Sequence, residues 1–293
     1  MKTVSIVIPT YNRADMVHRA IESSLMQTYP CEVIVCDHGS TDNTPEVVQK
    51  YSERVKYIRR EMDFGPHFCW LDGVLHSKSE FVHIQYDDDW IDNSYIEKMM
   101  NLMGDDVGFC FSQTLICDPQ GKKLKELFSD VSTLFQTGIH DIEKLEKILI
   151  AGLMISPGAC LYRRQTILDA LYQGNLLIRP FCHYHGVGPD HFMTFAALLC
   201  YRKFGFCTEP LAYFCEHTSS ITVNAQNNSE RQQQLQAAYW NVKCYYKLLK
   251  LYNTNRLFRT YVLSKGRKIA YLKYELKHFF DVLCHKKGQK YDE

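Results

Sequence analysis

The stretch F-V-H-I-Q-Y-D-D-D-W-I-D, residues 81–92, joins an apolar segment to three adjacent carboxylates. Its first part, residues 81–86, predicts a strand, and Asp87, Asp88 and Asp89 come where that strand would leave the sheet. Three neighbouring negative charges repel one another, and a turn requires no more than one aspartate. The cluster therefore indicates a function beyond turn formation.

The segments around this stretch alternate between strand and helix patterns. Continuous β-branched runs predict buried strands, and apolar residues at helical spacing predict helices between them. This alternation indicates an α/β fold with a Rossmann-like, mostly parallel sheet that helices cover on both faces. The expected strands are residues 4–8, 31–37, 55–60, 81–86, 107–118, 158–164 and 207–217, and the expected helices are residues 13–27, 44–52, 67–76, 142–149, 190–201 and the chain from 229 onward.

Charge is distributed unevenly along the chain. The 34 Lys and Arg residues nearly balance the 33 Asp and Glu residues, so no global field points to nucleic acid. Residues 229–293, however, contain 14 basic and 5 acidic residues, whereas residues 1–228 contain 20 and 28. We therefore expect one domain over residues 1–228 and a basic helical C-terminal extension over residues 229–293.

The extension interleaves Tyr, Leu and Phe with Lys and Arg. This composition suits an amphipathic helix that contacts an anionic membrane surface peripherally. A helix that packs on the preceding domain and exposes a basic face fits nearly as well. Formation of an oligomer through the extension is a third alternative.

Cysteine usage and hydropathy favour a cytoplasmic protein. The twelve cysteines are scattered and form no C-x-x-C pair, and the sequence begins with a strand pattern rather than a signal peptide. No apolar stretch approaches the roughly 18 residues that a membrane-spanning helix needs. We expect free thiols in a reducing cytoplasm, with the protein at the inner face of the plasma membrane if its extension binds lipid.

Polar residues follow three of the expected strands. In an open α/β sheet, ligands bind beyond the carboxyl ends of the strands, where residues 9–13, residues 37–42 and the three aspartates would lie. A carboxylate cluster there suits Mn²⁺ or Mg²⁺, which takes one or two carboxylates and completes its shell with water and phosphate oxygens. Such an ion makes a diphosphate a better leaving group. The alternative is a solvated acidic turn.

Three motifs together resemble the family 2 glycosyltransferases with a GT-A fold. They are V-S-I-V-I-P-T-Y-N-R at 4–13, E-V-I-V-C-D-H-G-S-T-D-N-T at 32–44 and Y-D-D-D-W at 86–90. The resemblance covers roughly residues 2 to 222 and makes residues 1–228 the catalytic domain. It implies transfer of a sugar from a nucleotide-diphosphate donor to a saccharide or lipid-linked acceptor, usually with inversion and with Mn²⁺ or Mg²⁺. By analogy alone, the setting is synthesis of a bacterial surface polysaccharide.

The resemblance also assigns site residues. The D-x-D motif of the family falls on the three aspartates, so Asp89 is the expected direct metal ligand, and Asp87 and Asp88 serve metal, ribose or donor sugar. His217, in E-H-T-S-S-I-T, matches a histidine that approaches the metal or the diphosphate, which gives Asp87, Asp89 and His217 as metal ligands. The expected nucleotide-sugar-binding residues are Pro9, Tyr11, Arg13, Asp37, His38, Gly65, Asp87 and Asp88.

The expected general base is Asp190. Inversion requires a base that takes the proton of the acceptor hydroxyl on the face opposite the diphosphate. The family places an acidic residue for this at the start of a later helix, and G-V-G-P-D-H-F, residues 186–192, matches it. Pro189 replaces the glutamate that precedes the aspartate in many members. Asp190 would also make a good helix cap, which is compatible with the base role.

Two departures concern the nucleotide base. Many relatives have a second aspartate after the second strand, which hydrogen-bonds uracil, whereas Asp37 is followed by His38 here. They also often have an arginine in the helix before the D-x-D strand, where this chain has Trp70. The resemblance therefore does not imply a uridine donor.

Two other functions fit parts of the pattern. A sugar-phosphate nucleotidyltransferase uses a similar sheet and metal, but it should have a Gly-rich, basic loop after the first strand, which P-T-Y-N-R-A-D is not. A catalytically inactive sugar- or nucleotide-binding subunit would be favoured by loss of a metal carboxylate or of the base. Neither is missing.

Overall fold

The computed structural model describes residues 2–172, 189–217, 229–255, 257 and 259. The chain divides into two compact units, Met1–Tyr246 and Lys247–Glu293, and each is considered by itself. No helix within the described ranges has the length and hydropathy that a membrane span requires. Every cysteine in these ranges has a free thiol, as expected.

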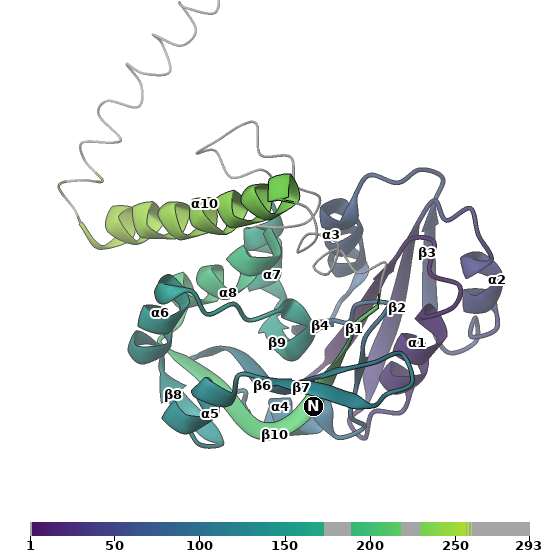
Figure 1. The fold of residues 1–293 in the computed structure, drawn as a ribbon, viewed down its shortest axis with the longest axis horizontal. Helices are drawn as coiled ribbons and strands as arrows, with labels where there is room; N and C mark the ends of the chain where they lie inside the picture. Colours follow the sequence, from purple (N-terminus) through teal and green to yellow (C-terminus); the bar gives the residue numbers. More distant parts are fainter. Residues whose placement is uncertain (1, 173–188, 218–228, 256, 258, 260–293) are drawn as a thin grey trace, which may run out of the picture. The chain divides into compact units, whose positions relative to one another are not determined.

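In the described part of the first unit, ten strands form one sheet (Figure 1). Its main order is β3-β2-β1-β4-β9-β6-β10-β5, with β7 paired to β6 and β8 paired to β10. The strands are β1 (Val4–Thr10), β2 (Cys31–His38), β3 (Lys56–Arg60), β4 (Phe81–Ile84), β5 (Trp90–Ile91), β6 (Val107–Cys117), β7 (Lys123–Leu127), β8 (Gly138–Asp141), β9 (Cys160–Arg163) and β10 (Lys203–Cys215).

The first four strands are parallel, and the later ones are mixed. β1 pairs in parallel with β2 and β4, β2 pairs in parallel with β3, and β6 pairs in parallel with β10. β9 is antiparallel to both β4 and β6 and so joins the two halves of the sheet. β1 is buried along its whole length, because both of its neighbours and both covering layers exclude water.

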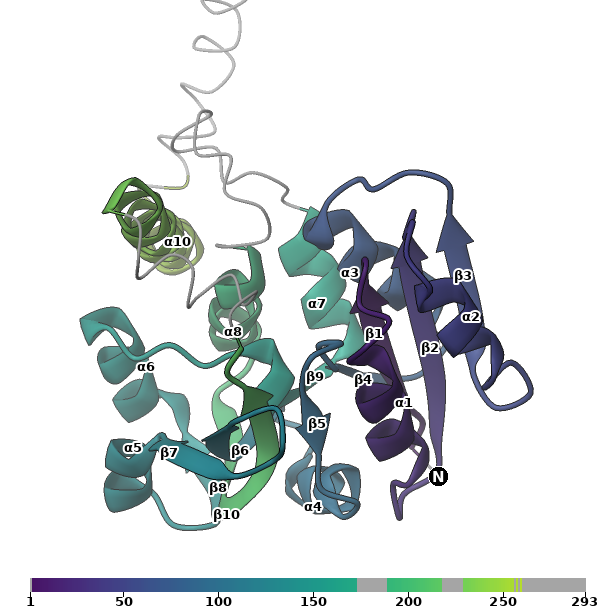
Figure 2. The ribbon, with the colours of Figure 1, turned by 45° about the vertical axis from the view of Figure 1, so that its right-hand side comes forward.

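Helices cover both faces of the parallel half. α1 and α2 lie on one face, and α3 packs with α7 on the other (Figure 2). Gly73 permits the close approach of α3, because a Cβ there would lie 2.3 Å from Val7 Cγ1. The predicted α/β fold is confirmed.

The helices are α1 (Val17–Leu25), α2 (Thr44–Gln49), α3 (Pro66–His76), α4 (Tyr95–Leu102), α5 (Ser129–Leu134), α6 (Ile142–Ala151), the 3₁₀ turn η1 (Pro157–Ala159), α7 (Arg164–Tyr172), α8 (Pro189–Cys200) and α10 (Ser229–Thr254).

The first part of α10 packs within the first unit. Val242 is fully buried, and the Tyr246 hydroxyl donates a hydrogen bond to Glu146 Oε1 of α6 at 2.8 Å. The Tyr246 ring also contacts Phe195 of α8, with ring centroids 4.7 Å apart. Packing, one of the three alternatives for the extension, therefore holds up to Tyr246. The domain boundary expected at residue 228 stays a prediction.

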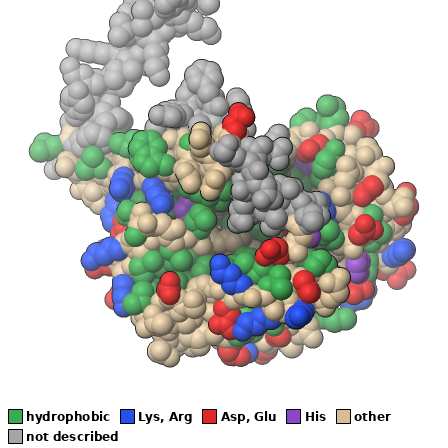
Figure 3. All heavy atoms as spheres, in the orientation of Figure 1, with side chains coloured by type: hydrophobic (Ala, Val, Ile, Leu, Met, Phe, Trp, Pro, Cys, Tyr) green, Lys and Arg blue, Asp and Glu red, His purple; other side chains and the backbone are tan. Residues whose placement is uncertain are grey.

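Basic and acidic side chains are interspersed on the face that Figure 3 shows. This agrees with the near balance of 34 basic and 33 acidic residues in the chain. The distribution on this face gives no support to a nucleic-acid partner, which would favour a stripe of one sign.

Candidate active site

The candidate site lies where the order of the parallel strands reverses. The chain passes from β1 to β2 on one side and later returns to β4 on the other side of β1. Ligands of open α/β sheets bind outside the carboxyl ends of the strands at such a point. The loop after β1 and the acidic turn, Asp87–Asp89, both leave the sheet here.

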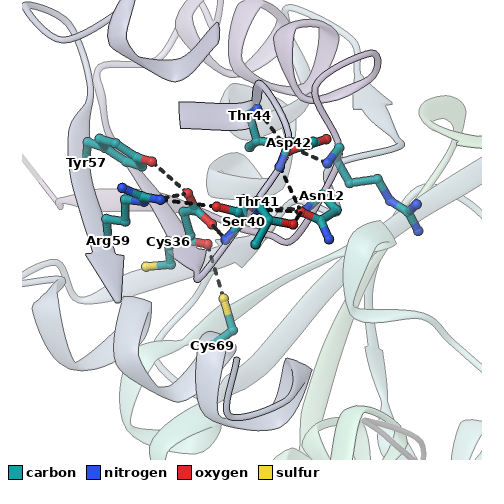
Figure 4. Close-up of polar contacts among 11 residues, drawn as sticks. Asn12, Cys36, Ser40, Thr41, Asp42, Thr44, Tyr57, Arg59 and Cys69 are labelled. Atoms are coloured by element: carbon teal, nitrogen blue, oxygen red, sulfur yellow. Dashed lines mark hydrogen bonds and ion pairs between the residues drawn. The ribbon is translucent and has the colours of Figure 1, made fainter. Parts of the chain in front are cut away.

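The loop after β1 is locked to the loop after β2 (Figure 4). Asn12 has a φ of 53°, a left-handed conformation that asparagine tolerates, and its Oδ1 accepts a hydrogen bond from Thr41 N at 2.8 Å. Its own backbone N–H donates to Ser40 Oγ at 2.9 Å, and Arg13 N donates to Thr44 Oγ1 at 2.8 Å. These bonds fix the backbone from which the Arg13 side chain extends.

Asp37 supports these loops from the end of β2. Its buried carboxylate accepts hydrogen bonds from Ser40 N at 2.9 Å and from the Tyr57 hydroxyl at 2.7 Å. Arg59 Nε lies 3.6 Å from Asp37 Oδ2. Both carboxylate oxygens thus have partners inside the protein, so the role that the structure gives Asp37 is to hold the loop. A direct contact between Asp37 and a nucleotide stays a prediction.

The acidic turn crowds negative charge into a largely buried space. Asp89 is 7% exposed, and the Asp87 side chain is 14% exposed. Burial and then the charge of Asp88 raise the pKa of Asp87 to about 7, and they raise the pKa of Asp89 well above its usual range. Arg13 opposes this effect, because its Nε lies 3.7 Å from Asp87 Oδ1. A divalent cation relieves such crowding.

The end of β10 runs along the acidic turn. Cys215 N donates a hydrogen bond to Asp89 Oδ1 at 2.8 Å, and His217 Nε2 lies 2.9 Å from Asp88 Oδ2. His217 therefore reaches the acidic turn, and its expected approach to a metal or a diphosphate stays a prediction. Its contact in the structure is with Asp88.

α8 brings Asp190 to the same region. Asp190 stands half-buried in the first turn of α8, and its Oδ1 accepts a hydrogen bond from His191 N at 2.7 Å. Tyr86 directly precedes the acidic turn. Burial, then the charge of Asp190 and, less strongly, that of Asp89 raise the pKa of Tyr86 well above its usual range. Asp190 and Asp89 therefore act on the same phenol, which keeps its proton.

Comparison with known proteins settles the family. A model of the family described as Glycosyl transferase family 2 matches residues 5–169. The chain belongs to this family. Putative glycosyltransferase EpsH of Bacillus subtilis is 26% identical over 285 residues, which cover 94% of this chain and 73% of EpsH. Membership of this family, together with the likeness to EpsH, makes the chain a glycosyltransferase.

The chain also resembles a second glycosyltransferase in sequence and a solved structure in fold. The GalNAc(5)-diNAcBac-PP-undecaprenol beta-1,3-glucosyltransferase of Campylobacter jejuni is 30% identical over 131 residues, which are 43% of this chain and 42% of that protein. The crystal structure of glucosyl-3-phosphoglycerate synthase from Mycobacterium tuberculosis, in complex with Mn²⁺, UDP and phosphoglyceric acid, has a similar fold. Its TM-score is 0.54 at 15% identity, with 83% of this chain and 78% of that chain covered.

In this family 2 glycosyltransferase, His38 is enclosed at the end of β2. It is 1% exposed, its Nε2 lies 3.4 Å from Asp72 Oδ2, and its ring contacts Phe64 and Phe68 at centroid distances of 6.4 and 5.8 Å. Burial lowers the pKa of His38 although Asp72 opposes the shift. The imidazole is therefore neutral near pH 7. Arg60 holds Asp72 through two hydrogen bonds of 2.8 Å.

Sequence reasoning missed the groups around His38. Asp72 stands on α3, 34 positions along the chain, and no motif marks it. Phe64 and Phe68 are 59% and 42% exposed, which the sequence does not indicate. Large apolar side chains seldom stay exposed side by side without a binding role. Trp70, at the position of the family's arginine, is buried and contacts Tyr86 with ring centroids 6.1 Å apart.

The structure also places the remaining expected nucleotide-binding residues, which are Pro9, Tyr11 and Gly65. Pro9 is buried at the end of β1, and Tyr11 is largely exposed in the loop that follows. Gly65, with a φ of 85°, turns the chain into α3, and only glycine adopts this backbone conformation readily. Their contacts with a nucleotide stay predictions.

The acidic turn fits a metal that arrives with a nucleotide. Within the described ranges, no three His, Cys, Asp or Glu side chains are arranged to hold an ion by themselves. Mg²⁺ and Mn²⁺ at phosphate sites need only one or two carboxylates, because water and phosphate oxygens complete the shell. Asp87 and Asp89 meet that need, whereas His217 is engaged with Asp88. The ligand set Asp87, Asp89 and His217 stays a prediction.

Replacement of Asp89 tests the metal role. Asp89→Asn removes the charge but keeps an oxygen that can accept the Cys215 N–H, so the fold should persist. Calorimetric titration with nucleoside diphosphates should show Mn²⁺-dependent binding in the wild type and none in the variant. Asp92→Asn, three residues further along, is the control and should bind as the wild type does. Unchanged Mn²⁺-dependent binding by Asp89→Asn would contradict the assignment.

Proposed function

We propose that this enzyme is a metal-dependent, inverting glycosyltransferase that uses a nucleotide-diphosphate sugar as its donor. The observation that supports this most is the buried acidic turn at the strand-order reversal. Asp190, in the first turn of α8, is a second carboxylate that suits the same chemistry. Buried carboxylates whose negative charge is only partly balanced, here by Arg13 beside Asp87, favour a bound divalent cation. A solved structure of similar fold contains Mn²⁺ and UDP, which supports the same ligand class for this chain.

The residues of the acidic turn would hold the donor. Asp89, with Asp87, would bind Mn²⁺ or Mg²⁺, which neutralises charge that develops on the diphosphate as the glycosidic bond breaks. The hydrogen bonds between the loops fix the backbone of Arg13. Arg13 would place its positive charge beside the same carboxylates, because its Nε lies 3.7 Å from Asp87 Oδ1. His217, which contacts Asp88, would steady that carboxylate.

Release of nucleoside diphosphate tests the proposed function. The full chain, incubated with UDP-, GDP- and dTDP-linked sugars and Mn²⁺, should release the diphosphate from at least one donor. Excess EDTA should stop this release, and added Mn²⁺ should restore it. Release that continues at the same rate in EDTA would contradict metal dependence.

Asp190 would act as the general base. It takes the proton of the acceptor hydroxyl as that oxygen attacks the anomeric carbon from the face opposite the diphosphate, which inverts the configuration. Asp190 suits this role because it is half-buried and close enough to the acidic turn to act on Tyr86.

Asp190→Asn separates the base role from a structural one. Asparagine keeps the Oδ1 that accepts the His191 N–H but cannot take a proton at neutral pH. Turnover should fall by roughly 100-fold or more, the usual magnitude for a general base, while donor affinity measured by calorimetry should barely change. A variant that loses donor binding and retains turnover would show that the role is different.

His38 would face the nucleotide base, together with the exposed rings of Phe64 and Phe68. Aromatic faces bind bases by stacking, and a neutral histidine can accept a hydrogen bond from the ring N–H of uracil or thymine. Neither ring nitrogen of His38 has a well-aligned hydrogen bond among the described residues. Nε2 faces Asp72, and Nδ1, which is also buried, would accept from a nucleotide base only after the Phe64 and Phe68 rings beside His38 move.

Nucleotide affinity should therefore depend on pH. Because burial lowers the pKa of His38, the ring takes up a proton only at a more acidic pH than an ordinary histidine does, and the protonated ring can no longer accept. Binding of UDP or dTDP should weaken as the pH falls from about 7.5 to 5.5. His38→Asp should bind uridine and thymidine diphosphates with little pH dependence, whereas His76→Gln, which alters another histidine beside Asp72, should behave as the wild type. Identical binding by wild type and His38→Asp across this range would place His38 outside the base pocket.

The acceptor would be a saccharide or a lipid-linked saccharide of a bacterial surface polysaccharide. The Campylobacter jejuni relative is named for an undecaprenol-linked acceptor, and the net charge of residues 229–293 suits an anionic cytoplasmic membrane surface. Sedimentation of the full chain with anionic vesicles tests the membrane contact. Binding that is absent at low salt would exclude it.

A further inference from the structure

Arg19 joins three segments of the site, and none of the motifs assigns it a role. It lies on α1, and its guanidinium stands 3.7 Å from the centroid of the Trp90 ring. Its Nη2 donates a hydrogen bond to the Asp88 carbonyl at 3.2 Å, and its Nη1 donates to the Pro119 carbonyl at 3.0 Å. One side chain thus connects α1, the acidic turn and the turn between β6 and β7.

Trp90 extends this contact to β10. The Trp90 and Tyr213 rings are stacked, with centroids 5.5 Å apart and an interplanar angle of 6°. These two residues also face each other in the antiparallel pairing of β5 with β10. Two residues further along β10, Cys215 N holds Asp89 Oδ1 at 2.8 Å. The acidic turn is therefore held by β10 through Asp89 and Trp90, and by Arg19 through Asp88 and Trp90.

Arginine suits this position for a reason that lysine does not share. Its planar guanidinium can lie against an aromatic ring while its two terminal nitrogens donate to different carbonyls. A lysine would retain the charge near the acidic turn but could not make this combination of contacts. Charge and positioning can therefore be separated by experiment.

We propose that Arg19 is a positioning residue for the acidic turn. By holding the Asp88 carbonyl and the Trp90 ring, it fixes the backbone that directs the carboxylate of Asp89 toward the metal of the donor. This inference rests on the proposed metal-dependent function. Arg19 itself touches no reacting atom.

Arg19→Lys is the decisive variant. The nucleotide is whichever of UDP, GDP, dTDP, ADP and CDP the wild type binds best. The measured quantity is the apparent affinity for Mn²⁺ in calorimetric titrations in the presence of that nucleotide. Arg19→Lys should lower this affinity by about 10- to 100-fold, the range found for groups that orient metal ligands. Trp90→Leu, which removes the platform and leaves the Arg19 charge, should lower it in the same direction.

Arg163→Lys is the matched control. Arg163 also combines an aromatic contact, 5.3 Å from the Phe81 centroid, with hydrogen bonds to the carbonyls of Val107 and Gly104, but it lies near the opposite end of β4. The control variant should lose a similar amount of thermal stability while its Mn²⁺ affinity stays at the wild-type value. This separates positioning from general destabilisation.

Three results would overturn the inference. Wild-type Mn²⁺ affinity in Arg19→Lys would show that only charge matters at this position. Equal losses of affinity in Arg19→Lys and Arg163→Lys would show a general structural effect. Absence of any Mn²⁺-dependent nucleotide binding in the wild type would contradict the proposed function itself, and with it this inference.

Discussion

Charge crowding in the acidic turn is the constraint on which the rest of the site depends. Three consecutive aspartates can lie in a largely buried turn only if neighbouring groups hold the backbone and balance part of the charge. Arg13 approaches from the loop after β1, His217 from the end of β10, and Arg19 from α1. Residues 13–19 and the end of β10, both distant in sequence from the acidic turn, therefore converge on it. The negative charge that they leave unbalanced equips the turn for a cation and a diphosphate.

The order of the sheet explains why these segments meet. β1 lies between β2 and β4, so the loop after β1 stands beside the acidic turn at the same edge. The pairing of β10 with β5 then brings the end of β10 alongside the turn from the second half of the chain. The parallel half would thus supply the donor side, whereas α8, from the mixed half, would supply Asp190 for the acceptor side. Both halves are required for the proposed reaction.

The sequence predicted the parts of this structure whose signal is local. Apolar runs predicted β1, β2 and β4, and the polar residues that follow them indicated the candidate site, because parallel strands end at one edge. Contacts between distant residues gave no such signal: Cys215 and Asp89 are 126 positions apart, and nothing in α1 marks Arg19 as a partner of Asp88. The strands β7 and β8 were missed because their largely exposed side chains lack the apolar run of a buried strand.

A crystal structure of the enzyme with Mn²⁺ and its nucleoside diphosphate, with anomalous data collected at the manganese edge, tests the central claim most directly. The account predicts one manganese peak at about 2.1 Å from an Asp89 carboxylate oxygen and from oxygens of the diphosphate, as hard cations of this size require. A diphosphate bound at the end of β1 with no anomalous peak beside the acidic turn, its charge met by basic side chains instead, would contradict it.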